Sequence, residues 1–153
     1  MLRLILLYAQ VAEKSLANVY RLYARRFDPG SAERALLESL EREERGHQAA
    51  LARLEDALGE DAGDAMVGEA KRALLEHQTR VTNDALDLMT DVQDPDADER
   101  ELAERAVRLE ESLIENVFGY MRFTAGSELH TMAHEMAEES RSHAERLRAA
   151  MLG

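Results

Sequence analysis

The chain has 153 residues, of which 33% are charged and 45% hydrophobic, and its formal net charge at pH 7 is −12. This length fits one domain over residues 1–153 with a sizeable core. The negative charge argues against a nucleic-acid partner, and no stretch reaches the roughly 20 apolar residues of a membrane span. The absence of cysteine excludes disulfides and thiolate-bound metals and is consistent with a cytoplasmic location.

The first segment, from Met1 to about Phe27, has the pattern of an amphipathic helix. Its buried face follows steps of three and four residues and comprises Leu6, Ala9, Glu13, Leu16, Tyr20, Tyr23 and Phe27. The opening residues are apolar, but the helical pattern continues past them without a cleavage site. We therefore interpret them as part of a core helix rather than a signal peptide. A turn over 28–31 ends this helix, and Ser31 is the expected cap of the next.

The second segment, up to about Leu58, places two ionisable residues in the middle of an apolar helix face. That face comprises Leu37, Leu40, Glu44, His47, Leu51, Leu54 and Leu58. Glu44 and His47 are three residues apart, so both side chains project from the same side of the helix. An unpaired carboxylate in a core has a high free-energy cost. A divalent metal ion is the partner that best fits this pair of side chains.

Three further helices are expected in the rest of the chain. Residues 64–92 have an apolar face that no glutamate interrupts. Residues 97–125 follow Pro95, and their buried face comprises Ala103, Ala106, Glu110, Leu113, Val117, Tyr120 and Thr124. The last helix follows the Gly126–Ser127 connection and runs to about Met151, with Leu129, Met132, Met136, Glu139, His143 and Leu147 along one side. The short connections predict that consecutive helices are antiparallel neighbours.

Four of the five predicted helices carry one glutamate near the midpoint of the buried face. The pattern is a loose repeat, because Glu13 and Glu110 each follow an alanine by four residues, and Glu43-Glu44 and Glu138-Glu139 each precede a histidine. Helices packed side by side would bring these midpoints to one level. The predicted metal ligands are therefore Glu13, Glu44, His47, Glu110, Glu139 and His143. Carboxylates with imidazoles suit iron, manganese or zinc, and four carboxylates balance two divalent ions.

Other residues are weaker candidates for this site. The nearest competing carboxylates are Glu43 and Glu111, which lie one position off the buried faces, and Glu115, which shares a face with arginines. Tyr20 and Tyr120 fall on buried faces, and either hydroxyl would find a partner in a site carboxylate or in ordinary packing. The remaining histidines are interpreted as surface or boundary residues or lie off the predicted face; they are His77, His130 and His134.

Over four of the five predicted helices, the sequence resembles the rubrerythrin-like branch of the ferritin-like di-iron superfamily. The matching residues are Glu13, Tyr20 seven residues later, Glu44-x-x-His47, Glu110 and Glu139-x-x-x-His143. There are departures. The last pair is spaced by four residues, Leu113 stands where such proteins carry a second glutamate, and the chain without cysteine lacks a rubredoxin-type iron domain.

The resemblance implies a single ferritin-like domain, an all-α four-helix bundle. Helix 64–92 is then expected to be an additional crossover, which departs from the family's usual connection. That helix would span about 43 Å and return the chain along the bundle; exchange of the last two helices in a swapped homodimer is the alternative. The implied function is an oxidoreductase with two iron ions, Tyr20 and Tyr120 lying beside them. Reduced iron would react with hydrogen peroxide or dioxygen, with electrons from a donor protein or free Fe(II). The competing hypothesis is a non-catalytic helical assembly protein with a structural metal or none.

Overall fold

The computed structural model of the chain describes residues 2–57, 68–121 and 128–153, with the backbone alone at 2, 4–5, 57, 68–71, 74, 115–121 and 128–129. Within these residues the chain forms five α-helices and no strand, which confirms the all-α prediction. The helices are α1 (Leu2–Ala24), α2 (Ala32–Ala57), α3 (Gly68–Asp91), α4 (Glu99–Met121) and α5 (Glu128–Leu147). A π-helical turn over Arg148–Leu152 extends α5.

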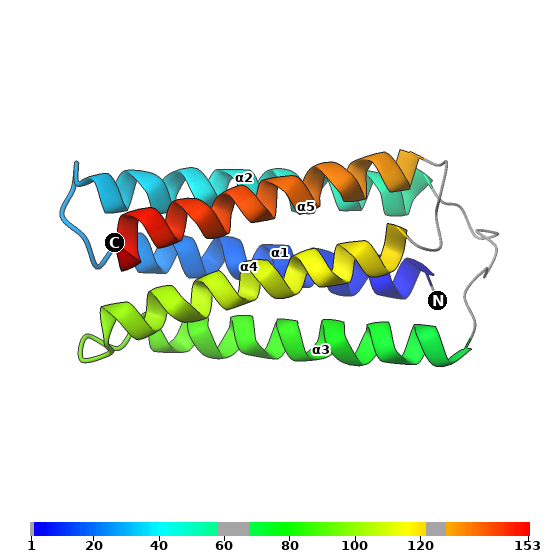
Figure 1. Ribbon diagram of the computed structural model, residues 1–153, viewed down its shortest axis with the longest axis horizontal. Coiled ribbons are helices and arrows are strands. Elements are labelled where there is room, and N and C mark those ends of the chain that lie inside the picture. The colour runs from blue at the N-terminus through cyan, green and yellow to red at the C-terminus, as the bar shows by residue number, and fades with distance from the viewer. Residues whose placement is uncertain (1, 58–67, 122–127) are drawn as a thin grey trace.

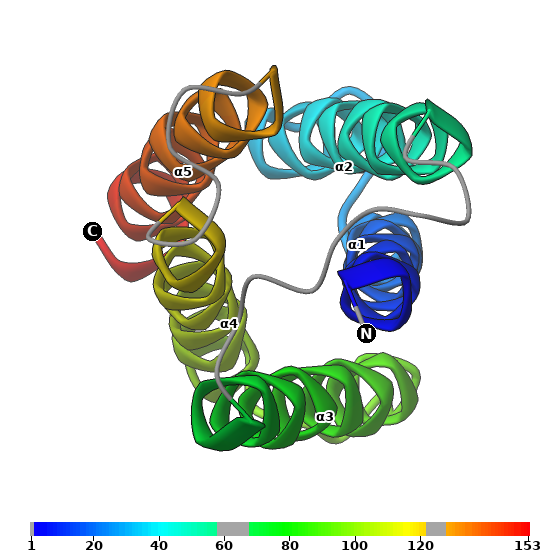
Figure 2. The same ribbon diagram turned by 90° about the vertical axis from the view of Figure 1, so that its right-hand side faces the viewer.

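The five helices lie side by side along one long axis, and each runs opposite to the one before it (Figure 1). Helix α1 packs against α2 and α3, α4 packs against α3 and α5, and α2 meets α5. Viewed along the axis, the helices form a ring in which α3 lies between α1 and α4 (Figure 2). Helices α2 and α4 therefore run in the same direction. Helix α3, which comes between them in the sequence, returns the chain along the length of the structure.

One expectation about connectivity changes in the structure. Helices α2 and α3 are consecutive and antiparallel, but their described residues are not in contact, because α3 covers α1 and α4 instead. The described helices pack on one another within one chain. In the part of the chain that is described, no helix has the combination of length and hydropathy needed to cross a membrane.

Helix ends follow local hydrogen bonding. Ser31 caps α2 as predicted, since its Oγ accepts the Arg34 N–H at 3.2 Å. Helix α4 begins at Glu99 rather than near Ala97, because Asp98 Oδ1 accepts the Glu101 N–H at 2.9 Å. Helix α1 ends at Ala24, three residues earlier than expected, and tighter turns replace its last helical hydrogen bonds. The Gly126–Ser127 connection and the start of the third helix at 64 lie outside the described residues.

Apolar clusters fill the interior, and two of them lie on either side of one level along α1, α2 and α5. The larger one contains Leu16 and Tyr20 of α1, Leu40 of α2 and residues of α3, α4 and α5. A smaller cluster is formed by Leu6, Ala9, Leu51 and Met136. On α1, Glu13 falls between Ala9 and Leu16, so this level is where the ionisable residues lie. The predicted apolar face of α3 is buried at Val81, Ala85, Leu88 and Val92.

Candidate metal centre

Five of the six predicted ligands are buried at this level. Their exposed fractions are 2% for Glu13, 0% for Glu44, 5% for His47, 0% for Glu110 and 0% for His143. Each stands within an apolar helix face, so burial of the face also buries the ionisable side chain. Helices α1, α2, α4 and α5 thus each contribute at least one ionisable side chain to the interior.

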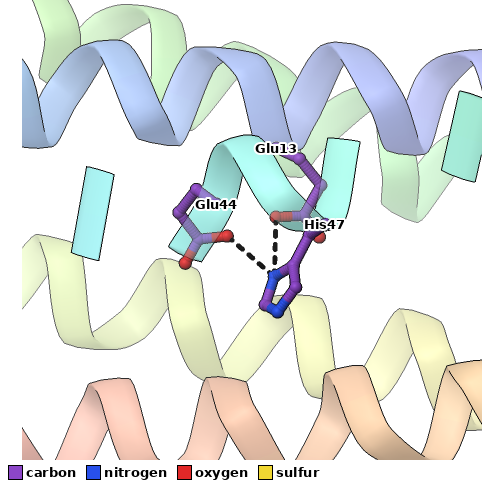
Figure 3. A group of neighbouring side chains, drawn as sticks. All are labelled: Glu13, Glu44 and His47. Atoms are coloured by element: carbon purple, nitrogen blue, oxygen red, sulfur yellow. Dashed lines mark hydrogen bonds and ion pairs between the residues drawn. The ribbon is translucent and has the colours of Figure 1, made fainter. Parts of the chain in front are cut away.

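The first group of ligand-type atoms comes from Glu13, Glu44 and His47 (Figure 3). His47 Nδ1 lies 3.1 Å from Glu44 Oε2 and 3.6 Å from Glu13 Oε2. One ligand atom from each residue lies within 4.8 Å of the others. The two carboxylates and the imidazole therefore converge on one point between α1 and α2.

The second group consists of Glu44, Glu110 and His143. One ligand atom from each of these residues again lies within 4.8 Å of the others. His143 Nδ1 lies 2.6 Å from Glu44 Oε1 and 3.3 Å from Glu110 Oε1. The imidazole rings of His47 and His143 are nearly parallel, with centroids 5.7 Å apart. Glu44 belongs to both groups and presents one carboxylate oxygen to each histidine. The two groups are therefore halves of one site with a shared carboxylate.

Glu139, the sixth predicted ligand, is not brought into either group. Its side chain is 55% exposed, and its carboxylate contacts His47 Nε2, the ring nitrogen that points away from the first group. Glu43 holds the equivalent place on the other histidine, with its Oε2 2.9 Å from His143 Nε2. Glu43 also accepts a hydrogen bond from Arg146 at 2.9 Å and one from Ser39 at 2.7 Å.

Tyr20 is fully buried beside the second group. Its hydroxyl donates a hydrogen bond to Glu110 Oε1. Burial first, and then the nearby Glu110 carboxylate, hold the pKa of Tyr20 well above its usual value, so the hydroxyl keeps its proton. The side chain of Tyr120 lies outside the described residues. His77 is half-buried on α3, with Nε2 3.2 Å from the Ser112 carbonyl oxygen, which agrees with a boundary residue.

Protonation neutralises much of the charge in this site. Burial, together with the charge of Glu44, raises the pKa of Glu13 to about 8. Burial alone would lower the pKa of His47, but its hydrogen bonds to Glu13 and Glu44 outweigh that effect and raise it to about 12. The same balance, with Glu110 and Glu44 as partners, raises the pKa of His143 to about 11. These raised pKa values favour the protonated forms of both imidazoles and of Glu13 in the metal-free protein.

The donor set fits divalent metal ions. Glu13 Oε2, Glu44 Oε1 and Glu110 Oε2 are buried oxygens; the first two lie 3.6 Å from His47 Nδ1 and 2.6 Å from His143 Nδ1, and Glu110 Oε2 accepts no hydrogen bond from the described residues. Buried carboxylate oxygens of this kind need a hydrogen-bond donor or a cation. A metal ion would replace the protons now held by the imidazoles and by Glu13. Carboxylate oxygen with imidazole nitrogen is a set that iron, manganese and zinc all accept.

A pocket of about 330 Å³ lies between α2 and α5. His47 lies among its lining residues, together with the outer carboxylates Glu43 and Glu139 and with Glu135. Small ions and molecules can therefore approach His47 from the side on which its Nε2 lies.

These features define an all-helical protein whose interior holds two linked groups of glutamate and histidine side chains able to bind metal ions. Comparison of the chain with protein-family models, with curated proteins and with solved structures found no match.

Glu43 is the residue that the sequence pattern undervalued. It lies one position off the apolar face of α2, yet it contacts His143 across the α2–α5 interface. The available signal was spacing, because Glu43 precedes His47 by four residues and Glu139 precedes His143 by four. By this alignment the counterpart of Glu44 is Ser140, which is 2% exposed, and not Glu139.

Proposed function

We propose that the protein is a ferritin-like di-iron carboxylate protein, an oxidoreductase in which Fe(II) reacts with hydrogen peroxide or dioxygen. The observation that carries this proposal is Glu44, a fully buried carboxylate shared by two groups of ligand-type side chains. A shared carboxylate suits two metal ions held next to each other. The proposed ligands are Glu13, Glu44 and His47 for one ion and Glu44, Glu110 and His143 for the other.

The helix arrangement supports the ferritin-like assignment. In such bundles the ligands come from four helices in two antiparallel pairs, joined by a crossover that leaves the second and third bundle helices parallel. Here α1 with α2 and α4 with α5 are the antiparallel pairs, α2 and α4 run in the same direction, and α3 supplies the return (Figure 1). The buried ionisable residues lie on those four helices, and none is buried among the described side chains of α3.

The iron ions would supply the two electrons that reduce peroxide or dioxygen. The chain's own residues would fix the ligands and limit water. Tyr20 holds Glu110 through its hydroxyl hydrogen bond, and the two apolar clusters close the site along the bundle axis. The pocket between α2 and α5 would admit a small oxidant to the side of His47.

The source of electrons and the preferred oxidant follow from what this chain carries. It has no cysteine to hold a second iron centre, so we propose that electrons come from a separate donor protein or from free Fe(II). Leu113, which stands where the resemblance implies another glutamate, is buried in the larger apolar cluster. Without that carboxylate we expect peroxide to be preferred over dioxygen less strongly than in rubrerythrins.

Anaerobic Fe(II) titration followed by stopped-flow oxidation tests the function. We expect about two Fe(II) ions per chain and oxidation of both by hydrogen peroxide or by dioxygen at matched concentrations. A thousandfold preference for peroxide would contradict the argument from Leu113. Tight iron binding without reaction towards either oxidant would contradict the oxidoreductase and favour a structural or assembly role. Absence of metal binding would contradict the whole proposal.

A further inference from the structure

We infer that Glu43 and Glu139 are a matched pair of positioning residues, each holding the histidine of the opposite helix with its Nδ1 directed into the metal centre. The inference rests on the proposed function and assigns Glu139 a role outside the ligand set. It concerns the α2–α5 interface, where the two outer carboxylates and the two histidines meet.

The contacts between the two helices are crossed. Glu43 of α2 reaches His143 of α5, with 2.9 Å between Oε2 and Nε2, and Glu139 of α5 reaches His47 of α2. In both cases the carboxylate meets Nε2, whereas Nδ1 of the same ring faces the buried glutamates. Because each glutamate stands four residues before the histidine of its own helix, the two contacts are related by the internal repeat.

The repeat separates the outer carboxylates from the inner ones. One position after Glu43, the α2 chain carries Glu44 with no exposed surface, and one position after Glu139, the α5 chain carries Ser140 with 2%. A step of one residue turns a helical side chain by about 100°, so neighbouring positions face different ways. Glu139 has the place of Glu43, beside the opposite histidine, and the inward place on α5 belongs to Ser140.

A carboxylate on the outer ring nitrogen is a recognised means of preparing a histidine ligand. It accepts the Nε2–H hydrogen bond, which leaves Nδ1 without a proton when the metal binds, fixes the ring orientation and makes the ligand more basic. Removing such a partner typically lowers metal affinity about 10- to 100-fold. A true ligand lost from the centre would instead reduce the number of ions bound.

Zinc titration and histidine ¹⁵N NMR of the zinc-loaded full chain test the inference. We expect Glu139→Ala and Glu43→Ala to keep two zinc ions at saturation but to weaken binding about 10- to 100-fold. The Nε2–H signal of His47 should change in Glu139→Ala, and that of His143 in Glu43→Ala. Glu139→Gln should recover much of the affinity, because its amide oxygen accepts the same hydrogen bond. Glu135→Ala is the control, since this exposed residue lines the same pocket.

The outcomes separate this inference from the proposed function. If wild-type protein binds no zinc, the proposed function fails and the positioning role fails with it. If wild-type protein binds two ions but both Glu139 variants bind fewer while Glu43→Ala binds two, Glu139 is a ligand and only the inference is overturned. It is also overturned if each alanine variant changes the histidine of its own helix. Thermal melting of Glu43→Ala checks that loss of the Arg146 contact leaves the chain folded.

Discussion

The α1–α2 and α4–α5 halves of the molecule supply the centre in different ways. Each half provides one buried glutamate on its first helix, one buried histidine on its second, and an outer carboxylate for the opposite histidine. The inward position before the histidine is Glu44 on α2 but Ser140 on α5. One half therefore provides the carboxylate that both groups share.

The two outer carboxylates, Glu43 and Glu139, also differ in how firmly they are held. Glu43 is anchored by Arg146 and Ser39 and has a side chain that is 35% exposed. Glu139 is 55% exposed, and its carboxylate contacts His47. His143 is thus held by a more constrained neighbour than His47. We therefore expect the second group to be the better ordered one before metal binds.

Removal of the shared carboxylate should have the largest effect. Glu44→Ala takes one oxygen from each group, so we expect iron or zinc binding to fall from about two ions per chain to fewer than one. Elemental analysis after metal loading measures this. Glu41→Gln, a surface change on the same helix that affects a pair with Arg45, is the matched control. Retention of a fully loaded ion in Glu44→Ala would show that the halves are independent.

A carboxylate at the α5 position that corresponds to Glu44 should increase the stabilisation that metal binding gives. Ser140→Glu introduces a carboxylate at the buried α5 position that corresponds to Glu44. We expect a lower melting temperature without metal, because a charged group enters the core, and a larger increase on metal binding than in wild type. Ser142→Glu, at an exposed position of α5, provides the comparison. An increase no larger than that of wild type would mean that position 140 does not face the centre.

The single glutamates of α1 and α4 should differ in the metal-free protein. Glu13→Leu removes a buried carboxyl that is costly to desolvate, and we expect the free energy of unfolding to rise. Glu110→Leu also leaves the Tyr20 hydroxyl without its acceptor, which costs about 1–3 kcal/mol. Denaturant unfolding of the two variants measures the difference. If the two variants are equally stable, or if Glu110→Leu is more stable than Glu13→Leu, the assigned contact between Tyr20 and Glu110 is contradicted.

The metal-free protein should lose stability as pH rises from about 5 to 9. The folded chain raises the pKa of Glu13 from 4.5 to about 8, mainly by burial, and carboxylates raise the pKa of His47 from 6.5 to about 12 against the effect of burial. A raised pKa stabilises the fold below the unfolded pKa, and this contribution is lost as pH rises towards the folded pKa. Unfolding at several pH values, without metal, measures the slope.

Metal should oppose this pH dependence, because binding displaces the same protons and strengthens as pH rises. If the stability of the metal-free protein does not change or increases between pH 5 and 9, the raised pKa values of Glu13 and His47 are contradicted. Glu13→Leu sharpens the test, since it should remove the part of the slope that lies between pH 4.5 and 8.

The sequence predicted the helices and the burial of five ionisable side chains at one level, because both follow one periodic pattern. The charged members of apolar faces, such as Glu13 and Glu110, were buried as expected, since a helix face is buried as a unit. The level of the site followed from their places near the helix midpoints. The start of α4 was predicted two residues early because the capping role of Asp98 was not recognised.

The role of Glu139 depends on contacts between helices that a single-helix pattern does not contain. Both Glu138–Glu139 and Glu43–Glu44 precede a histidine, and pairing them directly aligned Glu139 with Glu44. The rotation of α5 against α2 instead turns Glu139 towards His47 Nε2 at the surface. A shift of one position along a helix is enough to turn a side chain from an inner position to an outer one.

Anomalous diffraction from crystals grown anaerobically with Fe(II) tests the central claim most directly. We predict two iron peaks inside the bundle, one on the His47 side and one on the His143 side of Glu44, each next to the Nδ1 atom of its histidine. A single peak that excludes Glu44, or iron found only at surface carboxylates, would contradict the shared-carboxylate centre.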